Sequence, residues 1–151
     1  MIRLVFALRR QPHLTLAAFQ DYWLNQHAPL VASFATDLNI LRYVQTHTIE
    51  SRLNEAAQKA RGEMEPHYDG VAELWWSSEA DLTNQMESSG VKAAKASAAL
   101  IEDESNFIDL PRSPLWLAYE YPQINPSPEN ISAKPKSNIL RAFFPVRHQS
   151  K

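Results

Sequence analysis

The sequence predicts an α+β fold of the ferredoxin-like kind, an antiparallel four-stranded sheet with both helices on one face. Strand-like and helix-like patterns follow one another in two βαβ halves, which are separated by a polar excursion. The chain has only 3 glycines, and none forms the Gly-rich phosphate loop of a nucleotide-binding parallel sheet. With 151 residues, 44% of them hydrophobic, the chain is long enough for one domain with a substantial core.

The first half begins with alternation of apolar and polar side chains over residues 2–9, which is typical of a half-buried strand. Thr15 then suits an N-cap, and we expect the helix that follows to end near Asp37 and Asn39. Residues 40–49 are rich in β-branched and aromatic side chains and predict a second strand. The helix is indicated by apolar positions at helical spacing, namely Leu16, Phe19, Tyr22, Trp23, Leu30 and Phe34.

The second half begins with a polar segment, residues 51–70, which starts as a short helical run and ends in turn-forming residues. Residues 71–77 predict a third strand. Residues 79–101 predict a helical region that is interrupted near residues 88–90. The segment "SPLWLAYEY" predicts the fourth strand.

The domain boundaries follow from a change of composition after Glu120. We assign residues 1–121 to the domain and residues 122–137, with their repeated prolines, to an extended linker. Residues 138–151 return to a strand-like composition, and we expect a C-terminal strand and tail that adds to a sheet edge of this chain or of a partner. A disordered tail is the alternative.

Composition excludes several classes of function. The chain has no cysteine, so thiol catalysis and Cys-ligated metal centres are ruled out. The net charge is −2 and the basic residues are scattered, so the sequence indicates no basic surface that would bind nucleic acid or an anionic membrane. No window reaches the roughly 18 apolar residues of a membrane-spanning helix. The N-terminal apolar stretch is interrupted by Arg3 and indicates a strand rather than a targeting peptide, so we expect a cytoplasmic protein.

The predicted fold leaves one face of the sheet uncovered by helices. The third and fourth strands carry several tryptophans, and an open apolar face of more than a few hundred square ångströms normally marks an interaction site. A second copy packed sheet to sheet would cover this face. The sequence therefore predicts a homodimer that encloses a space between two sheets.

His27 is the first candidate for chemistry. At about 100° per residue it lies on a flank of the stripe formed by Phe19, Trp23, Leu30 and Phe34. Pro29 cannot donate to the carbonyl of Asn25, so the helix ends or kinks there and leaves carbonyl groups near the imidazole. The helix end favours imidazolium and burial favours the neutral ring, which predicts a pKa suited to acid/base work. The alternative is that His27 only bonds a free carbonyl and fixes the kink.

The second set of candidates comes from strand parity. Tyr43, Gln45 and His47 share one face of their strand, and Glu73 shares a face with Trp75. If these faces line the cavity between two sheets, they form a pocket with an amide, a carboxylate and a second imidazole. The alternatives are a polar layer at a dimer interface for Gln45 and His47, an ion pair of Glu73 with Arg3 or Arg42, and core positions for the tryptophans.

Four segments together resemble the EthD family of the dimeric α+β barrel superfamily, and the resemblance covers about residues 1–118. The segments are "FQDYWLNQHAPL", "LRYVQTHTI", "YDGVAELWW" and "FIDLPRSPLW". The most specific positions are Tyr22, Trp23, His27, Pro29 and Leu30. The resemblance implies two subunits whose sheets face each other and makes His27 the principal candidate. Family members are linked to ethyl tert-butyl ether degradation, and fungal relatives resemble decarboxylases and dehydratases of aromatic polyketides.

Two hypotheses of function follow. The first is a cofactor-independent enzyme, an oxidoreductase such as a monooxygenase or a lyase, that acts on a small hydrophobic carbonyl or phenol compound. His27 and His47 are then the catalytic residues, while Trp23, Tyr43, Gln45, Glu73 and Trp75 bind the substrate. The second is a non-catalytic dimeric protein that binds a small hydrophobic molecule. We expect no metal, because no His-x-His or HExxH spacing occurs, and haem binding through one histidine is a weaker alternative.

Overall fold

We describe a computed structural model of the chain, which covers residues 1–88, 90–121, 123–124, 142–144 and 146. The chain divides into two compact units, Met1–Glu120 and Tyr121–Lys151. The sheet, the helices and the candidate site all belong to the first unit. The expected linker at residues 122–137 and the expected strand at 138–151 lie almost entirely outside the described residues.

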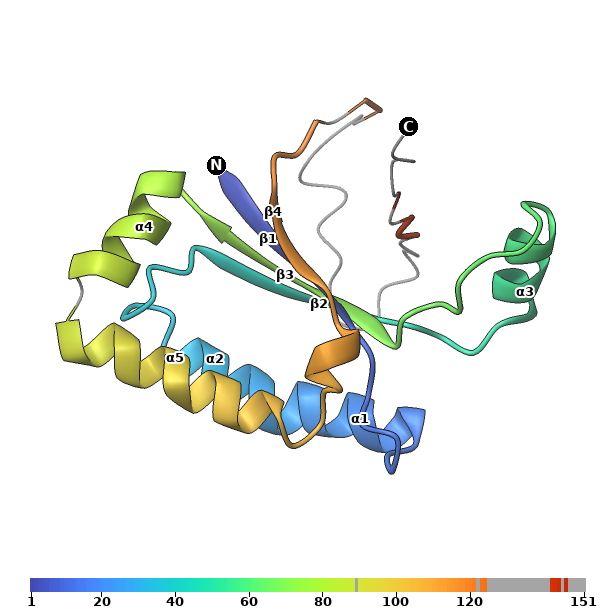
Figure 1. The fold of residues 1–151 in the computed structure, drawn as a ribbon, viewed down its shortest axis with the longest axis horizontal. Helices are drawn as coiled ribbons and strands as arrows, with labels where there is room; N and C mark the ends of the chain where they lie inside the picture. Colours follow the sequence, from blue (N-terminus) through green and yellow to red (C-terminus); the bar gives the residue numbers. More distant parts are fainter. Residues whose placement is uncertain (89, 122, 125–141, 145, 147–151) are drawn as a thin grey trace. The chain divides into compact units, whose positions relative to one another are not determined.

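The sheet confirms the predicted fold class. Its strands are β1 (Ile2–Leu8), β2 (Arg42–His47), β3 (Gly70–Trp76) and β4 (Leu115–Ala118), and their order is β2-β3-β1-β4. The three neighbouring pairs are all antiparallel. Each half contributes one central and one edge strand, as the ferredoxin-like arrangement requires. The helices α1, α2 and α5 lie on one face of this sheet (Figure 1).

The first helical region runs without a break through Pro29. It consists of α1 (Leu16–Tyr22), the π-helix η1 (Trp23–His27) and α2 (Ala28–Ser33). Thr15 caps it as expected, because its hydroxyl accepts the Ala18 N–H at 3.1 Å. Pro29 falls in the first turn of α2, where a missing N–H costs little. The expectation of an end near Asp37 and Asn39 was a few residues too long, since a turn at residues 34–39 follows α2.

The second helical region is interrupted where the sequence indicates. Helix α4 (Glu79–Ser88) and helix α5 (Gly90–Glu104) are separate elements, and α5 lies beside the first helical region (Figure 1). The polar excursion contains α3 (Arg52–Lys59), which is capped by Ser51 and stands apart from the helix layer. A short 3-10 helix, η2 (Leu110–Arg112), leads into β4. No helix in the described ranges is long and apolar enough to cross a membrane.

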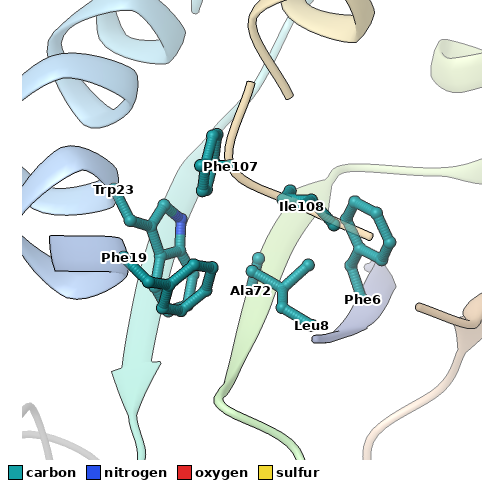
Figure 2. Packing of buried hydrophobic residues seen from close by; sticks show 7 residues of the cluster. All are labelled: Phe6, Leu8, Phe19, Trp23, Ala72, Phe107 and Ile108. Atoms are coloured by element: carbon teal, nitrogen blue, oxygen red, sulfur yellow. The ribbon is translucent and has the colours of Figure 1, made fainter. Parts of the chain in front are cut away.

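The main core lies between the sheet and the first helical region. Phe19 and Trp23 from the helices pack against side chains of β1 and β3 and against the segment after α5 (Figure 2). Gly70 makes this packing feasible, because a Cβ there would overlap the Trp23 ring and lie 2.9 Å from the carbonyl oxygen of Thr46. The cluster consists of Phe6, Leu8, Phe19, Trp23, Ala72, Phe107 and Ile108.

Candidate functional site

The π turn decides which helical side chains are buried. In η1 the Ala28 N–H bonds the Trp23 carbonyl, five residues back, so this turn holds one residue more than an α turn. The buried positions recur every four residues, at Phe19, Trp23, His27 and Val31. A uniform α-helical pitch predicted that His27 would lie on a flank of the apolar stripe that contains Phe19 and Trp23. The wider turn instead brings it into the middle of the buried side, where it is 5% exposed.

His27 meets a carboxylate from the far helix. Its Nδ1 lies 2.7 Å from Oδ2 of Asp103, near the end of α5. The hydroxyl of Tyr22 donates to the other carboxylate oxygen, Oδ1, at 2.8 Å. The ring of Phe107 packs against the imidazole with centroids 5.1 Å apart. The expected alternative, a bond from His27 to a free backbone carbonyl, is wrong, because the observed partner is a carboxylate.

The Asp103 contact sets the protonation pattern of His27. A carboxylate only accepts hydrogen bonds, so Nδ1 carries the proton and Nε2 is the basic atom. Burial lowers the pKa of His27, and the hydrogen bond and charge of Asp103 oppose that change. Among the described side chains, Arg3 Nε is the only fully enclosed nitrogen or oxygen that lacks a partner. Nε2 of His27 also has no hydrogen-bond partner within the described ranges, and because it is not among the fully enclosed atoms it retains accessible surface.

Glu104, next to Asp103, is a candidate that the sequence reasoning missed. Burial, together with the charge of Asp103, raises the pKa of Glu104 from 4.5 to about 7. No hydrogen bond to this carboxyl is found within the described part of the chain. A signal for both residues existed in the sequence, because "EDE" places acids in the last turn of a helix, where the helix dipole disfavours negative charge.

Tyr43, Gln45 and His47 form a second network on the helix side of the sheet. The Trp23 indole nitrogen donates to the Tyr43 hydroxyl at 2.9 Å, and Gln45 Nε2 bonds both that hydroxyl and the Trp23 carbonyl at 2.9 Å. His47 Nε2 lies 2.9 Å from Gln45 Oε1, and its ring stacks on Trp23 at 4.5 Å. Burial lowers the pKa of His47.

Comparison with known proteins identifies the family. The EthD domain profile matches residues 11–111, about two thirds of the chain. The chain belongs to the EthD family. The match spans every element from α1 to α5 and the first two residues of η2, and it therefore contains both networks described above. No curated protein matches the chain.

Solved structures of EthD proteins share this fold. An EthD family protein from Bacillus halodurans has 18% sequence identity and a TM-score of 0.51, with 80% of this chain and 100% of that chain covered. An EthD-like protein from Ralstonia eutropha has 12% identity and a TM-score of 0.50, with 83% and 96% covered. At such identities the likeness concerns the fold alone.

The EthD domain does not bring all predicted site residues together. In the sheet register Tyr43 pairs with Leu74 and Gln45 with Ala72, on the helix face, whereas Glu73 pairs with Val44 on the opposite face. The idea that Glu73 shares one cavity with Tyr43 was therefore wrong. Side chains that contact Trp23 lie in the helix layer and cannot also line a space between two sheets.

On the opposite face, Glu73 and Trp75 belong to an ion-pair and stacking arrangement. Arg3 Nη1 bonds Glu73 Oε1 at 2.8 Å, which confirms one of the two predicted ion pairs. The guanidinium groups of Arg3 and Arg42 lie 5.9 and 4.7 Å from the centroid of the Trp75 ring. Trp75 and Trp76 are buried, and Trp116 is 38% exposed. These contacts favour a structural part for Glu73 and Trp75.

The EthD domain has a cavity of about 450 Å³ elsewhere, at the other end of the sheet. Its lining includes Asn39, Leu41 and Asp81 but no residue of the His27 or His47 networks. Among the residues described, no group of three His, Asp or Glu side chains could hold a metal ion. The candidate site is therefore defined by the two networks around Trp23 and His27, and the polar groups available there are imidazoles, a phenol and carboxyls.

Proposed function

We propose that this EthD-family protein is a cofactor-independent enzyme that acts on a small hydrophobic or aromatic carbonyl or phenol compound. The observation that carries the proposal is the bond between His27 Nδ1 and Asp103 Oδ2 at 2.7 Å, which leaves Nε2 as the basic atom. A base that is oriented by a carboxylate is the usual arrangement for removing a proton from a bound molecule. Asp103 is then a positioning residue, and Tyr22 holds Asp103 in turn.

The chemistry expected from this arrangement is proton transfer next to a carbonyl or phenol. His27 Nε2 takes the C–H proton, and the electron pair of that bond moves into an enolate. A conjugated enolate can be reprotonated at a different carbon, and an enolate with a hydroxyl group on the next carbon can expel hydroxide, which takes the proton from His27 and leaves as water. An enolate can also add dioxygen to give a peroxide, and loss of water from that peroxide leaves a new carbonyl, as in a monooxygenase. In a decarboxylation the loss of CO₂ produces the enolate, and His27 delivers a proton to it. Because burial lowers the pKa of His27, the ring is neutral near pH 7 and ready to accept a proton. His47 is the proposed second acid/base or orienting group.

We also propose that the protein is a homodimer through the sheet face that α1, α2 and α5 leave free. Two facts support this. Within the first unit, the helices that pack on the sheet all lie on its other face (Figure 1). Trp116 of the edge strand β4 lies on the free face, because it pairs with Val5 in the same register position as Glu73, and its side chain is 38% exposed. Light scattering tests the proposal, and a single-chain mass at micromolar concentration would refute it.

Hydrogen exchange at an acidic C–H group tests the catalytic proposal directly. The probe is 2-tetralone, an aromatic ketone, in D₂O, and ¹H NMR follows the loss of its α-proton signal. Each turnover transfers one proton to the imidazole and returns one deuteron to carbon. We expect the full-length protein to accelerate exchange above buffer, and His27→Gln to reduce that acceleration about a hundredfold or more. Asp103→Asn should reduce it less, because the base remains but loses its orienting partner.

The control is His13→Gln, which removes an imidazole from an exposed loop position and should leave exchange unchanged. Equal exchange by wild type and His27→Gln would exclude His27 as the base. A protein that binds 2-tetralone, as seen by saturation-transfer NMR, but exchanges it no faster than buffer would favour the alternative function, a non-catalytic small-ligand carrier. That alternative is supported by the close packing of His27 against Phe107, which a purely structural histidine would also show.

A further inference from the structure

The direction of each hydrogen bond in the Trp23–Gln45 network is fixed by chemistry. The Trp23 carbonyl oxygen can only accept, so the Gln45 atom that faces it at 2.9 Å is the amide nitrogen. That nitrogen also lies 2.9 Å from the Tyr43 hydroxyl, and the Trp23 indole N–H lies 2.9 Å from the same hydroxyl. Both nitrogens donate. The Tyr43 oxygen therefore accepts two hydrogen bonds.

This arrangement determines where the Tyr43 proton points. With two donors on its oxygen, the hydroxyl keeps its own hydrogen for a third partner, and the described residues supply no acceptor for it. Burial and the nearby negative charge of Glu104 raise the pKa of Tyr43 to about 12, although Gln45 and Trp23 oppose this. The phenol is consequently protonated at neutral pH. Tyr43 presents a hydrogen-bond donor and has no acceptor capacity left.

The tautomer of His47, at the far end of the network, also follows from its hydrogen-bond partner. Gln45 Oε1 is an acceptor, so His47 Nε2, at 2.9 Å, carries the imidazole proton and Nδ1 is unprotonated. His27 has the opposite pattern, with its proton on Nδ1 because Asp103 accepts there. The two histidines are thus expected in different tautomers. This difference can be observed without any ligand.

We propose that Tyr43 is a specificity-determining residue, whose hydroxyl donates to an acceptor oxygen of the ligand while Trp23 and Gln45 hold it in that direction. The ligand oxygen would be a ketone carbonyl or a phenolate, and a group that offers only a hydrogen would find no acceptor at Tyr43. The proposal rests on the ligand class of the proposed function and deepens it. Trp23 is 1% exposed and acts as a positioning residue in this scheme rather than as a ligand contact.

The first test is the tautomer of His47 in the unliganded full-length protein. Long-range ¹H–¹⁵N NMR spectra distinguish the two neutral forms by their nitrogen shifts. We expect His47 to carry its proton on Nε2 and His27 on Nδ1, at a pH where both rings are neutral. A neutral His47 with its proton on Nδ1 would mean that the Gln45 amide is reversed, and the assignment of Tyr43 as an obligate donor would be overturned.

The second test compares 2-tetralone with tetralin, which has the same rings but no oxygen. Isothermal titration should show that the wild-type protein prefers 2-tetralone, and that Tyr43→Phe reduces this preference about fivefold, the effect of one lost hydrogen bond. Gln45→Glu should reduce it similarly, because a carboxylate placed against Tyr43 would draw the hydroxyl proton away from the ligand. Tyr119→Phe, at an exposed tyrosine of the same unit, is the matched control and should retain the preference.

The outcomes separate this proposal from the proposed function. Binding affinities can be measured without catalysis. A wild-type preference for 2-tetralone that depends on Tyr43 therefore supports the role of the Tyr43 hydroxyl as a donor to the ligand, even if the protein catalyses no hydrogen exchange. Equal affinities for the two probes, an unchanged preference in Tyr43→Phe, or no binding of 2-tetralone at millimolar concentration would each overturn it. Thermal unfolding of each variant checks that a lost preference does not come from a lost fold.

Discussion

Glu104→Gln should stabilise the protein at alkaline pH. The pKa of the Glu104 carboxyl rises from 4.5 to about 7 on folding, first because of burial and second because of the charge of Asp103. The folded state therefore holds this proton more tightly than the unfolded state. The contribution of protonated Glu104 to the free energy of unfolding is fully present below pH 4.5 and is lost as the pH rises through about 7. Glutamine imitates the protonated form and does not titrate.

The size of the effect follows from the change in pKa. The pKa of Glu104 differs by about 2.5 between the folded and unfolded states. At about 1.36 kcal/mol per pKa unit, this difference corresponds to about 3 kcal/mol in the free energy of unfolding. Because the side chain is only partly buried, solvent screening makes about 2 kcal/mol a sounder expectation. The free energy of unfolding of Glu104→Gln should thus equal that of wild type near pH 4 and exceed it by about this amount near pH 8.

Urea unfolding between pH 4 and pH 8, with the difference between variant and wild type taken at each pH, measures the effect. The difference cancels contributions from other groups, including His27 and His47, whose lowered pKa values reduce stability as the pH falls below 6.5. Glu102→Gln, at an exposed acid of the same helix end, is the control for the helix dipole and should gain only a few tenths of a kcal/mol. A difference that stays constant with pH, or a Glu104→Gln variant that is less stable at pH 8, would refute the reasoning.

Two further predictions concern the core around the candidate site. Gly70→Ala should cost about 1 to 3 kcal/mol and lower the melting temperature, because the added methyl group would overlap the Trp23 ring and lie 2.9 Å from the Thr46 carbonyl oxygen. An unchanged melting temperature would contradict the close approach at Gly70. Phe107→Ala should cost about 3 to 5 kcal/mol in urea unfolding, since Phe107 is fully buried and packs against the His27 ring. A cost below about 1 kcal/mol would show that the site is loosely packed.

The fold was predictable because its helices and strands have clear hydrophobic periodicities, and because capping and turn-forming residues mark where they begin and end. The first strand, the Thr15 cap and the break before α5 are all signalled by local features, and the structure confirms these three elements. The half-buried pattern expected for β1 was wrong, because Val5 and Ala7, on the face expected to be polar, are buried as well. The order of the sheet follows once two βαβ halves are recognised, because few topologies accommodate them. The polar excursion was predicted for the same reason, since a segment without an apolar face cannot join the core.

The candidate site was predictable only in part, because its contacts join distant segments. Strand parity correctly placed Tyr43, Gln45 and His47 on one face, but parity alone does not say which face meets the helices. We expected these side chains to line a pocket between two sheets. In the structure the Trp23 indole, the Trp23 carbonyl and the amide of Gln45 satisfy one another instead. Asp103 was missed because no local pattern connects it with His27, 76 residues earlier.

The structure also differs from the prediction at the helical turn that contains His27. This turn explains why His27 is buried and does not lie on the flank of the apolar stripe. At uniform pitch, a step of four residues turns about 40° too far, so three steps from Phe19 to Val31 would spread over about 120°, wider than one buried stripe. The π turn at Trp23–His27 absorbs this drift by adding a residue, and all four side chains are buried. Its carbonyl at Trp23 accepts the Ala28 N–H and also Gln45 Nε2, so the same turn anchors the second network. The π turn is therefore the local feature that joins the two networks: His27 at its end bonds Asp103, and Trp23 at its start bonds Tyr43.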